Sequence, residues 1–324
     1  MKDLAEKIIQ QDRRAVSQAI TLVESSREDH RAQALELSGY LQKAGRQAVR
    51  IGLSGTPGVG KSTFIESFGI FLTSQNLRVA VLAVDPSSVR SGGSILGDKT
   101  RMDRLSRDPL AFIRPSPSLS HLGGVTRRTR EAVAVCEAAG FDIVLIETVG
   151  VGQSETTVSE ISDIFVLLLS PTGGDELQGV KRGIMEMADL VLVNKADGDL
   201  KSAALRTCAD FSGALRLLRN RPQDPEGYPK VLTVSAISEI GLDVAWEAMQ
   251  YFVNWRRSEG HFDRRRALQA RFWFDEDVKQ GVLASLSQFD VSALIQRIGQ
   301  EVENGDILPE VGAARVLKEL KQLL

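Results

Sequence analysis

The stretch Gly55-Thr56-Pro57-Gly58-Val59-Gly60-Lys61-Ser62 decides how this chain of 324 residues folds. It fits the pattern G-x-x-x-x-G-K-[ST], in which a glycine-rich loop surrounds phosphates with main-chain N–H groups. An apolar run at residues 49–54 precedes the loop, and a helical segment from Thr63 follows it. This order predicts the binding of a nucleoside triphosphate. We expect Lys61 to reach the β- and γ-phosphates and the Ser62 hydroxyl to hold Mg²⁺.

Composition is that of a globular protein with a sizeable core. Hydrophobic residues make up 43% of the chain and charged residues 25%, which fits one large α/β domain with helical extensions or two domains. The net charge of −2 gives no reason to expect attraction to nucleic acid or a membrane. Cys136 and Cys208 lie far apart and the histidines are isolated, so neither a disulfide framework nor a zinc site is indicated.

No part of the sequence looks like a membrane span or a secretion signal. No run approaches the roughly 18 apolar residues that a spanning helix needs. The N-terminus is charged from Lys2 onward and lacks an apolar signal core. We therefore expect a cytoplasmic protein.

Short apolar runs alternate with helical stretches between residues 49 and 235. These runs are residues 49–54, 78–84, 141–148, 164–170, 190–194 and 231–234. Most are nearly continuous Val, Ile and Leu, as in parallel strands that are covered on both faces. The sequence thus predicts a doubly wound, mostly parallel α/β sheet of the P-loop NTPase type. Its ligands should bind at the carboxyl ends of the strands.

Two aspartates follow the second apolar run. Asp85 comes directly after it, and Asp98 comes after the glycine-containing residues 91–94. Near a triphosphate, a carboxylate at a strand end is a ligand for Mg²⁺, and the glycines would let the loop rearrange with nucleotide state. Helix caps and turns also use aspartate, so each residue alone fits a structural role as well.

The third run ends in an acid that a glycine follows three positions later. Glu147 and Gly150 resemble the GTPase segment in which the acid holds Mg²⁺ through water and the glycine N–H contacts the γ-phosphate. Many small GTPases place a water-orienting glutamine directly after that glycine, where this chain has Val151. Gln153 comes two residues later and cannot be assumed to replace it. We therefore expect slow unaided hydrolysis.

Asn194-Lys195-Ala196-Asp197 follows the fifth run and indicates guanine as the base. The Asp197 carboxylate could accept hydrogen bonds from the N1–H and the exocyclic amine of guanine, and adenine lacks this donor pair. Ser235-Ala236-Ile237, after the last run, fits a second loop at the base edge. A four-residue pattern is weak by itself, but at a strand end downstream of a phosphate loop it indicates GTP rather than ATP.

A further glycine-rich loop lies on the ligand side of the predicted sheet. It contains Gly174-Asp175-Glu176-Leu177-Gln178-Gly179-Val180-Lys181, and small GTPases have no counterpart with this composition. The position favours a functional loop. An ordinary connection between a strand and a helix is the alternative.

Helical segments flank the α/β pattern. Residues 1–45 are predicted to form an N-terminal extension, residues 46–255 the P-loop GTPase domain, and residues 256–324 a C-terminal arm for packing or dimerisation. The arm carries an apolar stripe at Phe274, Val278, Val282 and Leu286. Its arginines could suggest RNA, but interleaved acids favour a solvated helix face. These arginines are Arg256, Arg257, Arg264, Arg265, Arg266 and Arg271.

Taken together, the motifs resemble one family. The segments are GTPGVGKS at 55–62, DPSS at 85–88, GDKTRM at 97–102, ETVGVGQ at 147–153, GDELQGVK at 174–181 and NKAD at 194–197. They are similar to the methylmalonyl-CoA mutase-associated GTPases, which are P-loop GTPases of the SIMIBI class. This family includes the human cobalamin A-type protein and proteins that older labels call arginine/ornithine transport kinases. The resemblance covers essentially the whole chain.

The resemblance implies a homodimeric GTPase that chaperones an adenosylcobalamin-dependent acyl-CoA mutase. Such a protein gates cofactor delivery from an adenosyltransferase and helps exchange damaged cofactor. Three loops, around residues 85–102, 147–157 and 171–181, would act as switches. Lys181 would stabilise the transition state when the partner is docked.

The resemblance also implies a set of site residues. Mg²⁺ would be bound near Ser62, Asp85, Asp98 and Glu147. The catalytic residues would be Lys61, Asp98, Glu147 and Lys181. GTP or GDP would contact Gly55, Thr56, Pro57, Gly58, Val59, Gly60, Lys61, Ser62, Thr63, Asn194, Lys195, Asp197, Ser235, Ala236 and Ile237.

Two other functions fit a P-loop protein of this size. A small-molecule kinase needs a general base aimed at the γ-phosphate within a substrate pocket, and the sequence shows no such constellation. A nickel or cobalt insertase GTPase usually carries Cys or His clusters near the site, which this sequence lacks. The chaperone hypothesis is therefore preferred.

Overall fold

The computed structural model describes residues 1–84, 102–114, 122–148, 154–171, 182–217, 221–285 and 289–323. The chain divides into two compact units, Met1–Ala267 and Leu268–Leu324. The first unit contains the sheet and every described residue of the predicted nucleotide site. The domain boundaries given above stay a prediction.

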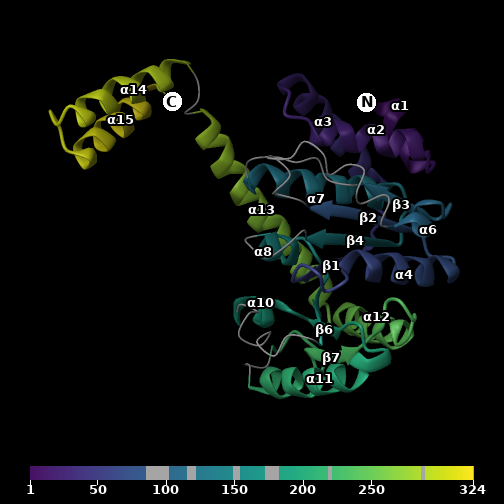
Figure 1. Ribbon diagram of the computed structural model, residues 1–324. Helices are drawn as coiled ribbons and strands as arrows, with labels where there is room; N and C mark the ends of the chain where they lie inside the picture. Colours follow the sequence, from purple (N-terminus) through teal and green to yellow (C-terminus); the bar gives the residue numbers. More distant parts are fainter. Residues whose placement is uncertain are drawn as a thin grey trace. The chain divides into compact units, whose positions relative to one another are not determined.

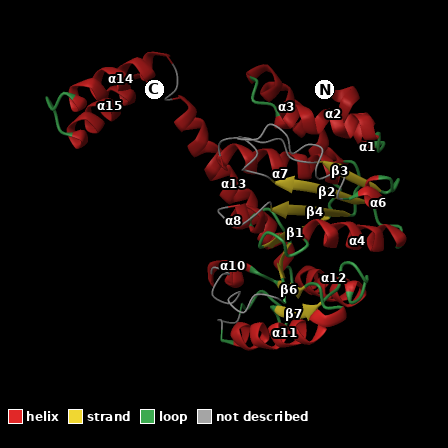
Figure 2. Ribbon diagram, viewed as in Figure 1, coloured by secondary structure: helices red, strands yellow, loops and turns green. Residues whose placement is uncertain are grey.

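The first unit is built on one parallel sheet of seven strands (Figures 1 and 2). The strands are β1 (Val49–Gly55), β2 (Val79–Val84), β3 (Ala111–Arg114), β4 (Ile143–Thr148), β5 (Ile164–Leu169), β6 (Leu190–Val193) and β7 (Lys230–Thr233). Their order is β3-β2-β4-β1-β5-β6-β7, and every pair of neighbours is parallel. The predicted doubly wound α/β fold is confirmed.

The strand that leads into the phosphate loop lies at the centre of the sheet. β1 pairs with β4 on one side and with β5 on the other, with Ile51 opposite both Leu145 and Ile164. All side chains of β4 and β5 are buried, as expected for parallel strands that helices cover on both faces. The loop after β1 therefore emerges in the middle of the carboxyl edge.

β3 is a strand that the sequence analysis missed. It pairs with β2 at the edge of the sheet, with Ala111 opposite Val79 and Phe112 opposite Ala80. It has four residues, and the last two are half-buried. An edge strand this short gives almost no periodic pattern in the sequence.

The helices fill the connections between the strands and extend both ends of the chain. Those described are α1 (Lys2–Ile9), α2 (Arg13–Glu24), α3 (Glu28–Leu41), α4 (Lys61–Ser74), α6 (Asp103–Ser106), α7 (Leu122–Ala138), α8 (Ser154–Ser159), α10 (Arg182–Met187), α11 (Lys201–Arg216), α12 (Leu242–Ser258), α13 (His261–Ser285), α14 (Phe289–Glu303) and α15 (Pro309–Leu323). Short 3₁₀ turns occupy Gln42–Ala44 and Gly198–Leu200. Among these helices none is long and apolar enough to cross a membrane.

Alternating residues of β1 pack against helices on opposite faces of the sheet. Ile51 and Leu53 join one buried cluster with Phe68 of α4 and with residues of α12. Gly52 faces α8 and the turn after it: an added Cβ would lie 2.8 Å from Val158 of α8 and 2.4 Å from the hydroxyl oxygen of Ser162 in that turn. A larger residue at this position would therefore push α8 away from the strand.

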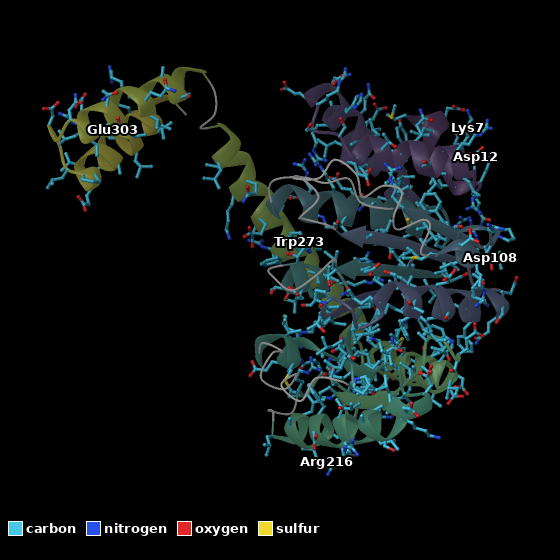
Figure 3. All side chains as sticks on the ribbon, in the orientation of Figure 1. Lys7, Asp12, Asp108, Arg216, Trp273 and Glu303 are labelled. Atoms are coloured by element: carbon cyan, nitrogen blue, oxygen red, sulfur yellow. The ribbon has the colours of Figure 1, made fainter. Side chains whose placement is uncertain are left out.

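The N-terminal helices pack on α7. The Asp12 side chain caps α2 by accepting hydrogen bonds from the N–H groups of Arg14 (2.8 Å) and Ala15 (2.9 Å). The buried face of α2, which includes Val16 and Ile20, lies against α7. At the loop before β3, Asp108 accepts a hydrogen bond from the Thr73 hydroxyl of α4 at 2.6 Å; Asp12 and Asp108 are labelled in Figure 3.

A buried ionic cluster joins α13 to the amino edge of the sheet. Arg266 donates two hydrogen bonds to Asp163, from Nε at 2.8 Å and from Nη2 at 2.6 Å. Nη2 also donates to the Ala48 carbonyl at 2.7 Å, and Nη1 lies 3.3 Å from Glu137. Arg50 completes the cluster with two hydrogen bonds to Glu137, at 3.0 and 2.8 Å. Segments from four parts of the chain meet here.

The expectation of a solvated face holds for Arg257, Arg264 and Arg271, which are exposed, but the structure contradicts it for Arg256, Arg265 and Arg266. Arg256 is buried, donates to the Asp163 carbonyl at 3.0 Å and forms an ion pair with Asp224. Arg265 donates to the carbonyls of Ser162 and Ser159. These side chains fasten the end of the domain to the sheet, and so they are not available for RNA.

The second unit contains the rest of α13 and a helical hairpin. Gly312 lets α15 approach α14 closely, since a Cβ would lie 2.8 Å from Val302 and 3.3 Å from Ile298. The predicted apolar stripe on α13 is exposed in this unit: Phe274 is 58%, Val278 50% and Val282 54% exposed. Leu286 lies outside the described residues.

Replacement of Asp163 by alanine should destabilise the fold strongly. Asp163→Ala leaves the mostly buried Arg266 guanidinium without its bidentate partner, and losing one member of a buried pair costs about 3 kcal/mol. Urea unfolding followed by circular dichroism measures the change. Asp29→Ala is the matched control, because the Arg27–Asp29 pair is exposed and contributes little. Equal shifts of the unfolding midpoint in both variants would contradict this assignment.

Candidate nucleotide-binding site

The phosphate loop connects β1 to α4 and depends on glycine at two positions. An added Cβ on Gly55 would lie 2.4 Å from the Leu168 carbonyl oxygen of β5. Gly60 has a φ of +91°, and its Cβ would lie 2.8 Å from Nδ2 of Asn194. The Gly60 carbonyl then accepts from the Phe64 N–H at 2.9 Å as α4 begins. The loop thus directs the free N–H groups of a 14-residue helix towards the carboxyl edge.

Lys61 lies inside the loop with its charge against main-chain oxygens. Its ammonium donates to the carbonyls of Gly55 (2.6 Å) and Thr56 (3.3 Å), and the side chain is buried. Burial lowers the pKa of Lys61, while the charges of Glu147 and Glu155 act in the opposite direction. A cation held this way suits the β- and γ-phosphates of a nucleotide.

Ser62 and Glu147 lie together beside the loop. The Ser62 hydroxyl is 3.4 Å from Oε1 of Glu147, which is buried near the end of β4. The next residue, Thr148, donates to the Ser54 hydroxyl at 3.1 Å and so joins β4 to β1 at this edge. A hydroxyl and a carboxylate are hard oxygen donors of the kind that Mg²⁺ prefers, so these residues fit the ion. Asp85 and Asp98 lie outside the described residues.

Asn194 connects the phosphate loop with the loop after β7. Its amide nitrogen donates to the Val59 carbonyl at 3.0 Å, and its amide oxygen accepts from the Ala236 N–H at 3.0 Å. Lys195 donates to the Gly58 carbonyl at 2.8 Å. Both residues of the predicted guanine motif therefore contact the phosphate loop directly.

Asp197 meets the loop after β7 at the predicted base edge. Its Oδ1 accepts from the Ser235 hydroxyl at 2.8 Å, and Ser235 Oγ accepts in turn from the Ser238 N–H at 3.1 Å. The loop is closed by a bridge between Ser235 and Ile240, and Ser67 of α4 donates to the Ala236 carbonyl at 2.7 Å. Ser235 thereby holds Asp197 through one carboxylate oxygen, Oδ1.

The structure brings the described members of the predicted site to one edge of the sheet. All of them lie at the carboxyl ends of strands or directly after them: the loop residues 55–62, Glu147, Asn194, Lys195, Asp197 and the residues 235–237. Thr63 and Ile237 lie there with exposed side chains. The residues Asp85, Asp98, Gly150, Val151, Gln153 and Lys181 fall outside the described ranges.

Glu155 is a site residue that the sequence analysis did not single out. It is 1% exposed in the first turn of α8, and its charge acts on Lys61. The only sequence signal for this role was a second acid eight residues after Glu147. Because a buried carboxylate needs compensation, Glu155 belongs to the charge balance of the phosphate loop.

Comparison with known proteins identifies the family. The model of the family described as "Methylmalonyl Co-A mutase-associated GTPase MeaB" matches residues 16–290. The chain belongs to the MeaB family. It is therefore a GTPase, an enzyme that hydrolyses GTP. Its family is named for an association with methylmalonyl-CoA mutase. The family predicted from the sequence motifs is confirmed.

Relatives of this MeaB-family chain extend over nearly its full length. The methylmalonic aciduria type A homolog, mitochondrial, of Mus musculus is 47% identical over 325 residues, covering 97% of this chain and 78% of the relative. GTPase ArgK of Escherichia coli K12 is 42% identical over 319 residues, covering 98% and 95%. A crystal structure described as an LAO/AO transport system kinase has a TM-score of 0.77 and 34% identity, covering 98% and 97%.

Replacement of Asp197 by alanine should abolish the preference for guanine. Asp197→Ala removes the acceptor for N1–H and the exocyclic amine, so GDP should bind about 100-fold more weakly while ADP binding stays weak. Isothermal titration with both nucleotides and Mg²⁺ measures this. Asp199→Ala, two residues later on an exposed turn, is the control and should bind GDP as the wild type does. Unchanged GDP affinity in Asp197→Ala would remove this carboxylate from the base site.

Proposed function

We propose that this protein is a GTP-dependent chaperone of an adenosylcobalamin-dependent acyl-CoA mutase. In this role it gates cofactor delivery from an adenosyltransferase, protects the mutase and helps exchange damaged cofactor. The observation that carries the proposal is the match of residues 16–290 to a family of mutase-associated GTPases. The mouse relative, named for methylmalonic aciduria, supports the same assignment.

The geometry of the loop suits GTP binding with the phosphates against Lys61. To reach the β- and γ-phosphates, the ammonium would exchange its hydrogen bonds with the Gly55 and Thr56 carbonyls for bonds with phosphate oxygens. Phosphate oxygens carry more negative charge than a carbonyl, so the exchange is favourable. During this exchange, the hydrogen bonds of Asn194 would hold the loop after β7 in place against the phosphate loop.

Ser62 and Glu147 would hold the Mg²⁺ that accompanies the nucleotide. When bound, the ion neutralises charge that develops between the β- and γ-phosphates. Glu147 is buried and lies 3.4 Å from the Ser62 hydroxyl, so both oxygens can face one cation. Asp85 and Asp98 are proposed as further members of this site on the sequence motifs alone.

Slow hydrolysis without a partner fits a protein that reports its nucleotide state to a mutase. Val151 stands where many small GTPases have a water-orienting glutamine. We propose that docking of the mutase brings Lys181 to the phosphates, and that this added cation raises the rate. Timing of cofactor transfer would then depend on the presence of the mutase.

We further propose that the protein is a homodimer that pairs through its C-terminal unit. Residues 268–285 expose Phe274, Val278 and Val282 at intervals of four along one helix. Such a stripe matches the seam through which two helices associate. A second copy of this chain would cover it with the same residues, as a symmetric interface requires.

A small-molecule kinase is the second candidate function. It is favoured by the crystal structure described as an LAO/AO transport system kinase, which is 34% identical to this chain. γ-Labelled GTP separates the two functions: the chaperone GTPase releases labelled phosphate to water, whereas a kinase transfers the label to a basic amino acid. Labelled arginine or ornithine in excess of free phosphate would favour the kinase.

Replacement of Lys61 by alanine should remove GTP hydrolysis. Without the ammonium, the β- and γ-phosphates lose their main cation from the protein, so we expect turnover to fall by about 100-fold or more. Malachite-green detection of phosphate measures it, and circular dichroism checks that the variant is folded. Lys201→Ala, at the exposed start of α11, is the control. Wild-type turnover in Lys61→Ala would refute the phosphate-loop assignment.

Addition of a methylmalonyl-CoA mutase should raise GTP turnover, and Lys181→Ala should lose that increase. A cation supplied on docking can accelerate phosphoryl transfer by about 10³-fold. Turnover with and without the mutase, together with gel filtration of the mixture, measures both effects, and Lys201→Ala should respond like the wild type. No complex and no stimulation would contradict the chaperone proposal. Equal stimulation of Lys181→Ala would remove only Lys181 from the mechanism.

A further inference from the structure

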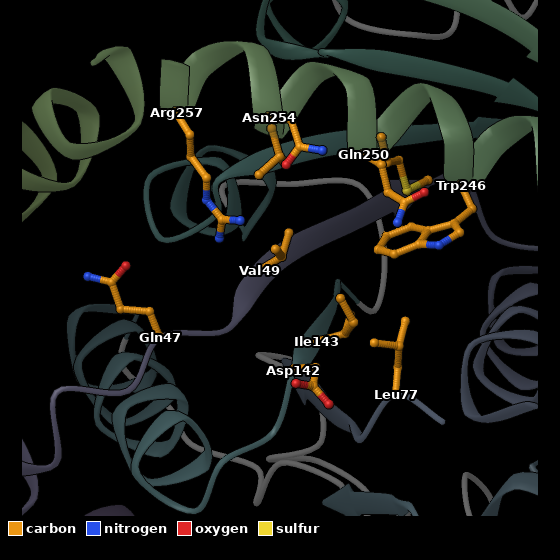
Figure 4. Close-up of a pocket in the computed structure, with 11 residues that line it drawn as sticks. Gln47, Val49, Leu77, Asp142, Ile143, Trp246, Gln250, Asn254 and Arg257 are labelled. Carbon is orange, nitrogen blue, oxygen red and sulfur yellow. The ribbon is translucent and has the colours of Figure 1, made fainter. Parts of the chain in front are cut away.

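A cavity of about 260 Å³ lies at the edge of the sheet opposite the nucleotide site (Figure 4). Val49 and Ile143, the first residues of β1 and β4, line it, as does Leu77 just before β2. The phosphate loop follows the other end of β1. The cavity is therefore separate from the proposed GTPase site.

One side of the cavity is apolar and is formed between the strands and α12. Trp246, Met249 and Val253 are buried on one face of that helix and turn towards the strand residues Val49 and Ile143. The indole ring of Trp246 lies at one end of this surface, as Figure 4 shows. A ligand that enters here would bury an apolar body against these side chains.

The other side carries the guanidinium of Arg257. Arg257 lines the cavity, and its guanidinium lies 4.8 Å from the ring centroid of Phe262. Within the described residues it forms no ion pair. Two nearby arginines differ in this respect, because Arg256 and Arg266 each form an ion pair with a buried acid. A guanidinium at the end of an apolar cavity offers two parallel donors that match a carboxylate.

Three amide side chains also line the cavity, two of them near Arg257. Asn254 and Gln250 come from the exposed side of α12, and Gln47 comes from the segment before β1. Each can donate a hydrogen bond to an anionic oxygen. In Figure 4, Asn254 and Gln47 lie on either side of Arg257 and Val49, and Gln250 lies beside Trp246. The polar groups therefore converge from two separate elements of the fold.

An acid on the strand side limits the charge that the cavity accepts. Asp142 lines the cavity below Ile143 and accepts a hydrogen bond from the Arg78 N–H at 2.8 Å. Its negative charge would repel a doubly charged phosphate more than a single carboxylate. The combination of Arg257 and Asp142 thus favours a ligand with one negative charge.

We propose that this cavity binds a small monocarboxylate with an apolar body. The carboxylate pairs with Arg257, and the body packs against Trp246 and Val253. At roughly 30 Å³ for each water-sized group, the volume holds about nine non-hydrogen atoms, the size of a carboxylate of six to eight carbons. Pairing at Arg257 sets the orientation, and burial of the apolar body supplies most of the affinity.

Titration of the full-length protein with hexanoate tests the proposal. Saturation-transfer NMR and calorimetry should detect binding with a Kd on the order of 1 mM or tighter. Hexanol and hexylamine have the same apolar body, so they should bind at least about tenfold more weakly. Saturating GDP with Mg²⁺ should leave hexanoate binding unchanged, because the two sites lie at opposite edges of the sheet.

Two variants locate the binding site. Arg257→Gln should weaken hexanoate binding by about tenfold or more, whereas Arg264→Gln, an exposed arginine outside the cavity, should not change it. Gln250→Trp places a bulky ring at the cavity from an exposed position and should abolish binding, while GTP turnover confirms that the fold is intact. The proposal is overturned by any of three results: no hexanoate binding to the wild type, equal binding to Arg257→Gln, or competition between hexanoate and GDP.

Discussion

A single buried amide holds the two halves of the nucleotide site together. Asn194 donates to the phosphate loop and accepts from the loop at the base edge, over sequence separations of 135 and 42 residues. Because both groups are buried, the loss of either bond would leave an unsatisfied polar atom. The same contact explains why residue 60 is glycine, since a Cβ would lie 2.8 Å from that amide nitrogen. The phosphate loop and the loop after β7 are therefore connected through one side chain.

The two edges of the parallel sheet have different roles. At the carboxyl edge, loops collect the charged and polar groups of the GTPase site, as the topology of such a sheet requires. At the amino edge, Arg50, Arg256 and Arg266 pair with buried acids and fasten the end of the domain. Buried pairs of this kind contribute little net stability, but they are costly to break, so they fix one arrangement of the chain. The cavity beside Arg257 lies at this same edge.

Charge balance links the phosphate loop to the segments that follow β4. Lys61 is buried among carbonyl oxygens, and Glu147 and Glu155 are the acids whose charges act on it. Glu147 also contacts Ser62, so one carboxylate lies close both to the lysine and to a hydroxyl that suits Mg²⁺. A phosphate bound at Lys61 would therefore interact electrostatically with Glu147 of β4 and Glu155 of α8. This physical coupling underlies our proposal that the protein reports its nucleotide state to a mutase.

The sequence alone determined the parallel α/β fold and the family, because the strands and the motifs are contiguous segments with local backbone requirements. The roles of the phosphate-loop and guanine-motif residues stay predictions. The sequence analysis missed β3, whose four residues at an edge leave no periodic pattern. It was wrong about Arg256 and Arg266, because their acidic partners lie 32 and 103 residues away. Only the tertiary structure decided these pairings, the bridge at Asn194 and the cavity beside α12. Contacts between distant segments depend on how the helices pack, and no local pattern in the sequence records that packing.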